Sequence, residues 1–218
     1  RDWEHSTGKK ELIGLSTTKD VQDAILNDPA NAAIVDIIDI RYWYYQADGS
    51  AYTPQGGQNL APRQHARLLK PKAASTQQIY RAVLEYKLRY PAKSVIYSAD
   101  GWEKNGWAVL MAGGSLPNVF VNDELFLQAV SAMQPMVTDT ASGQWVLHNE
   151  RGGYVIYNMS ADEISIDPAN RKGAYEVIWI NTSDGNTQKS RKKVKGGNRI
   201  NLSKPENGNW VLWLKPVM

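Results

Sequence analysis

The sequence predicts an α/β part, a partial (β/α)8 barrel of about four β/α units, followed by an all-β part, an antiparallel β-sandwich. Ahead of Pro135, apolar runs of strand length alternate with amphipathic helical stretches, whereas short strands and turn residues follow it. The first pattern is typical of parallel strands with helical crossovers, and the second of a small all-β domain. We therefore expect the C-terminal half of a barrel over residues 1–137 and a sandwich over residues 138–218.

The composition excludes several classes of protein. The chain has 218 residues, 42% of them hydrophobic and 22% charged, which is usual for soluble globular proteins of one large or two modest domains. A net charge of +3 is too small to indicate a nucleic-acid or membrane partner, and no apolar run approaches the ~20 residues of a membrane span. Without Cys there are no disulfides or thiolate ligands, and the 3 dispersed His residues lack metal-ligand spacing. No metal and no cofactor are expected.

The first elements are a strand and a helix. Leu12 to Ser16 has the apolar character of a buried strand. A helix is expected from Lys19 to Asn27, with Thr18 as its N-cap and Asp28-Pro29 as its end. Its apolar face is expected to comprise Val21, Ala24 and Ile25.

The second strand is expected from Ile34 to Ile40, a nearly continuous β-branched run of the kind that is buried on both sides of a parallel sheet. It continues directly into Arg41 to Tyr45. The polar stretch from Gln46 to Lys72 is too long for a simple connection, so it is a candidate functional insertion.

A second long helix is expected from Thr76 to Tyr90, because Ser75 is a good N-cap and Pro91 ends the pattern. Its apolar side is expected to include Ile79, Val83, Tyr86 and Leu88. The remaining elements of the α/β part are a strand, a short helix, a short strand and a last helix, at 94–97, 107–112, 119–121 and 123–133. The inward residues of the last helix are expected to be Leu125, Phe126, Ala129, Val130 and Met133.

Short strands recur about every ten residues in the all-β part, separated by Gly, Asn and Asp turns, as in antiparallel sandwiches. They are expected at 145–147, 154–157, 164–166, 175–180, 200–202 and 210–214. Trp179 and Trp213 alternate with apolar neighbours and are expected in the core. The basic run from Lys189 to Lys195 has no interleaved aromatic residues, which favours a solvated sheet edge guarded by charge over nucleic-acid binding.

Candidate site residues lie where strands end and the chain continues toward a helix, because the active sites of parallel barrels lie at the carboxyl ends of their strands. Three such ends are visible, at 16–18, 41–45 and 98–102. In the middle one, Arg41 precedes four aromatic residues, among them Tyr42, Trp43 and Tyr44. Alternate strand residues face opposite ways, so some of these rings should reach the barrel mouth and stack on sugars. The alternative is that they pack against the long loop.

Asp100 follows the third strand, a suitable place for a carboxylate nucleophile, a base or a substrate ligand, and Trp102 beside it is a candidate for sugar contact. Asp100 can equally well cap the following helix, and Glu103 is a weaker candidate. Asp36 and Asp39 lie within a strand and are expected to be paired with backbone or basic groups.

Two further features bear on substrate. His65 lies in the polar loop and either binds substrate hydroxyls or anionic sugars, or is simply solvated. The aromatic set is skewed, with 8 Trp and 11 Tyr but 2 Phe. Trp and Tyr combine an apolar face with a polar edge, which suits both sugar surfaces and core packing.

The two parts together resemble bacterial barrel glycoside hydrolases with a C-terminal sandwich of the collagen-binding type. In the sandwich, the similar segments are Gly173 to Asn181 and Gly208 to Lys215, separated by Asp184-Gly185 and Gly196-Gly197. In the barrel half, they are Val35 to Tyr45, Val95 to Gly101 and Trp107 to Gly114. The resemblance implies a periplasmic or extracellular protein that degrades a polysaccharide or oligosaccharide.

By this resemblance, the strand that ends at Asp100 matches the strand that carries a catalytic carboxylate in the family. The family pattern has Gly-Glu-Pro at this point, where the chain departs with Ser98 to Gly101. The second carboxylate that glycoside hydrolysis ordinarily needs would lie upstream of Arg1. The chain alone is therefore expected to be inactive.

Two other interpretations stay open at this stage. The barrel-like half has lost its chemistry in one of them, and the chain is a non-catalytic module that binds carbohydrate or scaffolds a partner. In the other, open sheet edges pair with a second copy or with a missing N-terminal segment.

Overall fold

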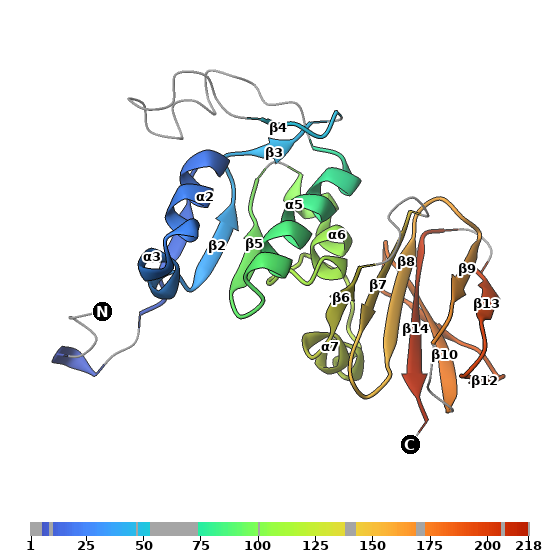
Figure 1. The fold of residues 1–218 in the computed structure, drawn as a ribbon. Helices are drawn as coiled ribbons and strands as arrows, with labels where there is room; N and C mark the ends of the chain where they lie inside the picture. Colours follow the sequence, from blue (N-terminus) through green and yellow to red (C-terminus); the bar gives the residue numbers. More distant parts are fainter. Residues whose placement is uncertain are drawn as a thin grey trace. The chain divides into compact units, whose positions relative to one another are not determined.

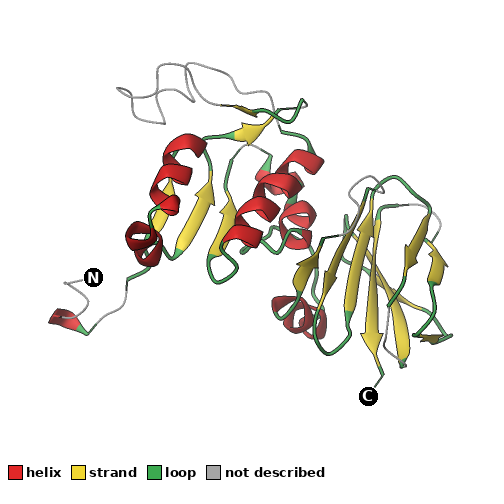
Figure 2. Ribbon diagram, viewed as in Figure 1, coloured by secondary structure: helices red, strands yellow, loops and turns green. Residues whose placement is uncertain are grey.

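The structure is a computed structural model that describes residues 6–8, 11–46, 48–52, 74–99, 101–137, 143–168, 173–205 and 208–217. The chain divides into two compact units, which we call unit 1 (residues 1–118) and unit 2 (residues 119–218). Figure 2 shows that unit 1 mixes helices and strands, whereas unit 2 is mostly strand. The domain boundary expected after residue 137 differs from this division and stays a prediction.

Unit 1 contains a three-stranded parallel sheet in the order β1-β2-β5 (Figure 1). The strands are β1 (Gly14–Ser16), β2 (Ile37–Ile40) and β5 (Ser94–Tyr97). The helices that accompany them are α2 (Lys19–Asn27), α3 (Pro29–Ile34), α5 (Thr76–Arg89) and α6 (Gly106–Met111). Shorter elements are the hairpin of β3 (Tyr44–Tyr45) and β4 (Ala51–Tyr52) and the 3-10 helix η1 (Trp102–Lys104).

The first strand differs from its prediction. Leu12 and Ile13 precede β1 with 67% and 36% of their surfaces exposed, and β1 pairs with β2 alone among the described residues. A strand at the edge of a sheet keeps one side open to solvent. The prediction of a buried strand from Leu12 to Ser16 was therefore wrong in its burial and in its start.

Helix α2 has the predicted bounds, but its buried residues are Gln22 and Leu26, while Val21 is 42% exposed. The predicted face of Val21, Ala24 and Ile25 was wrong because the packed face is anchored by a polar side chain. Helix α3 was not predicted. Asp28 caps it by accepting from the backbone N–H groups of Ala30 and Asn31.

Strand β2 begins at Ile37 rather than Ile34, because Ile34 is the last residue of α3. Its burial alternates: Ile38 and Ile40 are fully buried, whereas Ile37 and Asp39 are half-buried. Figure 1 shows α2 and α5 on one side of these strands. The expectation of a strand buried on both faces was wrong, since the residues of one face are fully buried and those of the other are half-buried.

Helix α5 is capped by Ser75 Oγ, which accepts from the N–H of Gln78 as predicted. Its buried face contains Ile79, Val83 and Tyr86, but Leu88 is 50% exposed, contrary to the prediction. The short helix α6 is buried along its whole length, and a Cβ at Gly106 would lie 1.8 Å from the carbonyl oxygen of Asn118. Gly106 thus permits a backbone contact that no other residue type allows.

Unit 2 contains a seven-stranded antiparallel sheet in the order β11-β10-β14-β8-β7-β6, with β12 also paired to β10, and a two-stranded sheet of β9 and β13. Its helix is α7 (Glu124–Ser131). The strands are β6 (Gln134–Met136), β7 (Gln144–His148), β8 (Tyr154–Asn158), β9 (Glu163–Ile166), β10 (Ala174–Asn181), β11 (Thr187–Lys189), β12 (Val194–Lys195), β13 (Ile200–Ser203) and β14 (Trp210–Pro216).

One hydrophobic core joins the two sheets of unit 2. Ile164 of β9 and Ile200 of β13 belong to the same cluster as Ile156 of β8 and Leu212 of β14. Trp179 and Trp213 are 5% and 2% exposed, so their predicted place in the core is confirmed. The antiparallel strands predicted after residue 144 are present, with β6, β11 and β12 in addition.

The short strand predicted at 119–121 does not form, and Phe120 is 63% exposed. The turn after β10 meets this segment, since a Cβ at Gly185 would lie 2.1 Å from the Phe120 carbonyl oxygen. Three parallel strands are therefore described before residue 119, rather than four. In α7, Phe126 and Val130 are buried as predicted, whereas Leu125 is 59% exposed.

Candidate functional site

Polar side chains gather at the carboxyl edge of the parallel sheet in unit 1. Strands β1, β2 and β5 run the same way, so all three end at this edge, on the side of the β3–β4 hairpin (Figure 1). Ser16 lies opposite Asp39 in the β1–β2 register, and the Ser98 hydroxyl donates to Asp39 Oδ1 over 2.6 Å. We call Ser16, Asp39 and Ser98 the edge cluster.

The edge cluster retains hydrogen-bonding capacity. Ser16 Oγ is buried, and it has no hydrogen-bond partner among the residues that the structure describes. Asp39 is half-buried and engaged by one hydroxyl. A carboxylate oxygen accepts more than one hydrogen bond, and a serine hydroxyl both donates and accepts. Such a set can bind the hydroxyl groups of a polar ligand.

The two aspartates of the β2 segment are both paired, but only Asp36 has the kind of partner that was expected. Asp36 Oδ2 accepts the backbone N–H of Ile13 over 3.0 Å, which fastens the start of β1 to β2. Asp39 is paired with the Ser98 hydroxyl rather than with a backbone or basic group. Asp39 therefore links the ends of β2 and β5 at the candidate site. Its place within an apolar run of the sequence did not indicate this role.

The buried amide of Gln22 organises the segment that leaves β2. Its Nε2 donates to the carbonyl oxygens of Leu15 and Asp39, each over 3.0 Å, and its Oε1 accepts the indole N–H of Trp43 over 2.8 Å. These carbonyls belong to the ends of β1 and β2, where backbone groups need partners outside the ladder. Trp43 is 1% exposed and packs edge-on against Tyr45 and Tyr86.

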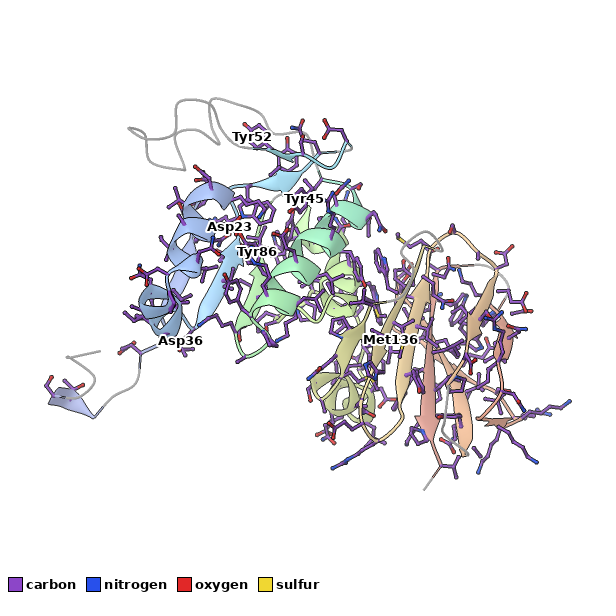
Figure 3. The ribbon with its side chains drawn as sticks, in the orientation of Figure 1. Asp23, Asp36, Tyr45, Tyr52, Tyr86 and Met136 are labelled. Atoms are coloured by element: carbon purple, nitrogen blue, oxygen red, sulfur yellow. The ribbon has the colours of Figure 1, made fainter. Side chains whose placement is uncertain are left out.

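A network of charged groups joins α2 to α5, and we call Lys19, Asp23, Glu85 and Arg89 the α2–α5 clamp. Lys19 Nζ lies 2.7 Å from Asp23 and 2.9 Å from Glu85, and Arg89 lies 2.9 Å from Asp23. The hydroxyl of Tyr86 donates to Asp23, and that of Tyr45 donates to Glu85. Figure 3 shows Asp23, Tyr45 and Tyr86 close together in this region.

The clamp shifts the ionisation of its members. Burial alone would lower the pKa of Lys19, but its hydrogen bonds to Asp23 and Glu85 outweigh burial and raise that pKa. Burial would raise the pKa of Asp23, but hydrogen bonds from Lys19 and Tyr86 hold it below its ordinary value. Burial and the hydrogen bond to Glu85 raise the pKa of Tyr45 to about 12. The clamp thus holds ionised Lys19 and Asp23 and a neutral Tyr45 near neutral pH.

The sequence-predicted residues around β2 have different surroundings. Arg41 is exposed and lies over the half-buried ring of Tyr42, at 5.6 Å from its centroid. Tyr44 is half-buried and stacks on Tyr52 with ring centroids 4.8 Å apart. Trp43 is enclosed, so its ring is not open to a ligand in this conformation. The assignment of these residues to substrate binding stays a prediction.

The other sequence candidates are partly outside the described residues. Trp102, in η1, is 45% exposed. Asp100 and His65 lie outside the residues that the structure describes, so their proposed roles stay predictions. Among the described residues, no group of three or more acidic or His side chains lies close enough to hold a metal ion. In the same part of the chain, no helix is long and apolar enough to cross a membrane.

Comparison with known families identifies the chain at the level of sequence. The model of a family described as a domain of unknown function, DUF6298, matches residues 1–133. The chain belongs to the DUF6298 family. The DUF6298 region thus contains the parallel sheet, the edge cluster and the α2–α5 clamp, and it extends through α7. A search of curated proteins found no match.

Comparison with solved structures finds glycoside hydrolases. A family 5 glycoside hydrolase from Bacteroides vulgatus is 13% identical with a TM-score of 0.55, and the match covers 97% of this chain and 57% of that chain. A protein described as a glycoside hydrolase is 12% identical with a TM-score of 0.48, over 87% of this chain and 54% of that chain. A family 44 xyloglucanase from Paenibacillus polymyxa is 14% identical with a TM-score of 0.40, and the match covers 90% of this chain and 50% of that chain.

At these identities the similarity concerns the fold and not the activity. The TM-score of 0.55 supports a glycoside hydrolase-like fold for the DUF6298 chain, and the two lower scores add nothing to it. The chain spans only 50% to 57% of the lengths of these structures.

Proposed function

We propose that this chain is the C-terminal portion of a glycoside hydrolase that acts on a polysaccharide or oligosaccharide. In this proposal, residues 1–137 form part of a (β/α)8 barrel and residues 138–218 form a β-sandwich of the collagen-binding type. The observation that carries it is the edge cluster, which brings a carboxylate and two hydroxyls to the carboxyl ends of three parallel strands. Active sites of parallel barrels lie at that edge. The glycoside hydrolase-like fold supports the same conclusion.

Specific roles follow from the positions of the side chains. We assign Asp100 as the catalytic carboxylate, and Arg41, Tyr42, Tyr44, His65 and Trp102 as substrate-binding residues. Because Trp43 is buried against Gln22, its contribution to sugar binding acts through the neighbours it supports. Ser98, two residues before Asp100 in the sequence, and Asp39, which accepts its hydroxyl, add hydrogen-bonding groups.

The proposed site is incomplete within this chain. Glycoside hydrolysis ordinarily uses two carboxylates that flank the scissile bond. We assign the second one to a segment outside residues 1–218, so that this chain alone binds carbohydrate without hydrolysing it. The proposed setting is the periplasm or exterior of a bacterium, where polysaccharides are available.

The test uses the full-length gene product that contains residues 1–218. Asp100→Asn should lower the release of reducing ends from a polysaccharide panel by about 100-fold or more, because a catalytic carboxylate loses its charge and proton-transfer capacity. Binding of the same polysaccharides, measured by calorimetry, should persist. Asp20→Asn is the matched control, because Asp20 is an exposed carboxylate of α2.

Two outcomes would reject parts of the proposal. Unchanged hydrolysis in Asp100→Asn removes Asp100 from the mechanism. Carbohydrate binding by the full-length protein without any hydrolysis supports the alternative function, a non-catalytic carbohydrate-binding or scaffolding module.

A further inference from the structure

Unit 2 carries an open basic hollow that the proposed hydrolysis does not use. Strands β11 and β12 both pair with β10, and between them the chain leaves the β10 edge at Ser190 and returns at Val194. A hollow of about 410 Å³ lies at this detour. The basic hollow is lined by Glu176, Lys189, Ser190, Arg191 and Lys193.

Positive charge dominates the basic hollow. Of the 7 residues from Lys189 to Lys195, 5 are Lys or Arg and none is acidic. Glu176 of β10 forms an ion pair with Lys189 at 3.0 Å and lies opposite Lys215 in the β10–β14 register. The hydrogen bond from Lys189, and then the charges of Lys189, Lys215 and Lys193, hold the pKa of Glu176 below its ordinary value. One carboxylate therefore stands among four cations, which leaves charge for an anionic ligand.

The lining suits a ligand that has both anionic groups and hydroxyls. Arg and Lys donate charge-assisted hydrogen bonds to carboxylate or sulfate oxygens. Glu176 and Ser190 can accept hydrogen bonds from hydroxyls. Figure 3 shows nitrogen-tipped side chains that project outward from the part of unit 2 around β12. Small-molecule sites typically enclose about 300–1,000 Å³, so the hollow has room for one or two sugar units.

The same lining does not suit nucleic acid. Single-stranded nucleic acids are held by aromatic side chains on which the bases stack, and the hollow has none in its lining. The carboxylate of Glu176 can accept hydrogen bonds from the hydroxyl groups of a polysaccharide, which the sugar-phosphate chain of DNA lacks. We propose that the basic hollow binds an acidic polysaccharide through its carboxylate or sulfate substituents. This binding is independent of the edge cluster, because all lining residues belong to unit 2.

The test measures binding of the complete chain to four probes: polygalacturonate, dextran sulfate, neutral dextran and single-stranded DNA. We expect polygalacturonate or dextran sulfate, or both, to bind more tightly than DNA, and dextran not to bind. The two acidic probes distinguish carboxylate from sulfate recognition. The double variant Arg191→Gln/Lys193→Gln should weaken the binding of the acidic polysaccharide about fivefold or more, and raised salt should do the same.

The matched control is Lys192→Gln/Lys195→Gln. It removes the same charge from the same exposed segment, but neither residue lines the hollow. Equal weakening by both double variants would show a diffuse charge effect and overturn the proposal. DNA binding as tight as that of the acidic polysaccharides would overturn it as well, and so would no binding of either polysaccharide.

The variant Glu176→Gln distinguishes a specific binding site from a surface that is merely positively charged. A merely positive surface should gain affinity for every polyanion when a negative charge is removed. In the proposed site, the variant should gain affinity for DNA more than for the acidic polysaccharide, so that the preference for the polysaccharide falls. An unchanged or increased preference would contradict a role for Glu176 in recognition.

Discussion

Gln22 shows how much of unit 1 depends on one side chain. Its fully buried amide satisfies two part-buried carbonyl groups at the ends of neighbouring strands and also the buried indole N–H of Trp43. A buried polar group is tolerated only when its hydrogen bonds are made. Gln22 thereby fixes the course of the chain after β2, where Arg41 and Tyr42 follow in the sequence.

Replacing Gln22 should be costly. We expect Gln22→Leu to lower the free energy of unfolding by about 2 kcal/mol or more, because it leaves a buried indole N–H and two part-buried carbonyl groups without this partner. Urea unfolding followed by circular dichroism measures the change. Ala24→Ser, on the exposed side of the same helix, should stay within about 0.5 kcal/mol of the original chain. A Gln22→Leu chain as stable as this control would show that the network is not needed.

At the scale of elements, the α2–α5 clamp holds two helices and the β3 strand together. Lys19 contacts carboxylates on both helices, and Tyr45 brings β3 to Glu85. Lys19 also lies over the rings of Trp43 and Tyr86, 5.2 Å from each centroid. Ion pairs that are partly shielded from solvent are screened less by salt than exposed pairs. The clamp is therefore expected to contribute to stability through its charges.

The clamp should make stability depend on pH. The folded-state pKa of Asp23 is below its ordinary value of 3.8, so its contribution is present above that value and is lost as the pH falls through the folded pKa. Asp23→Asn should therefore be less stable than the original chain near neutral pH, and the difference should shrink in acid below 3.8.

Urea unfolding at a series of pH values measures this difference. Asp20→Asn on the same helix is the control, since Asp20 is exposed, and its effect should be small throughout. A difference between Asp23→Asn and the original chain that does not vary with pH would show that shape, rather than charge, explains the role of Asp23.

At the scale of the whole molecule, the division into two units predicts that unit 2 folds by itself. The described residues of the hydrophobic cluster that joins the two sheets of unit 2 all belong to that unit. Helix α7 belongs to unit 2 as well, and Phe126 packs edge-on against Trp213 of β14 with ring centroids 5.4 Å apart. The segment ahead of residue 138 thus covers part of the all-β unit and supplies β6 to its sheet.

Two fragments test this organisation. Residues 119–218 should form a soluble, cooperatively unfolding β protein by themselves. Residues 138–218 should be less stable or aggregate, because they lack α7 and β6 and so expose Trp213 and the edge of β7. Thermal unfolding and solution mass distinguish the two. Equal stability of both fragments would favour the domain boundary after residue 137.

Local patterns in the sequence predicted the bounds of helices and strands better than the burial of their side chains. The bounds of α2 and β5 were predicted to the residue, and those of α5 to within one residue, because caps and apolar periods mark them. The buried face of α2 was missed because tertiary hydrogen bonds draw a polar Gln22 inward. Trp43 belongs to the segment of which some rings were expected at the barrel mouth, and it is buried with its indole N–H bonded to Gln22.

The sequence predicted where the candidate site lies, but not which residues form it. The three strand ends were identified from the sequence, and they do meet at one edge. The pairing of Asp39 with Ser98 depends on parallel register between residues 59 positions apart, which no local pattern reveals. Gln22 and Glu85 likewise act over long separations in the chain.

The position of β14 has a consequence for biosynthesis. This strand is the last of unit 2 along the chain, yet it lies between β10 and β8 and pairs with both. Before β14 has been synthesised, β8 and β10 lack the strand that pairs with both of them, so the sheet of unit 2 cannot be completed. We expect unit 2 to acquire its final form only after residues 210–216 have left the exit tunnel, and the nascent polypeptide to need protection from aggregation until then.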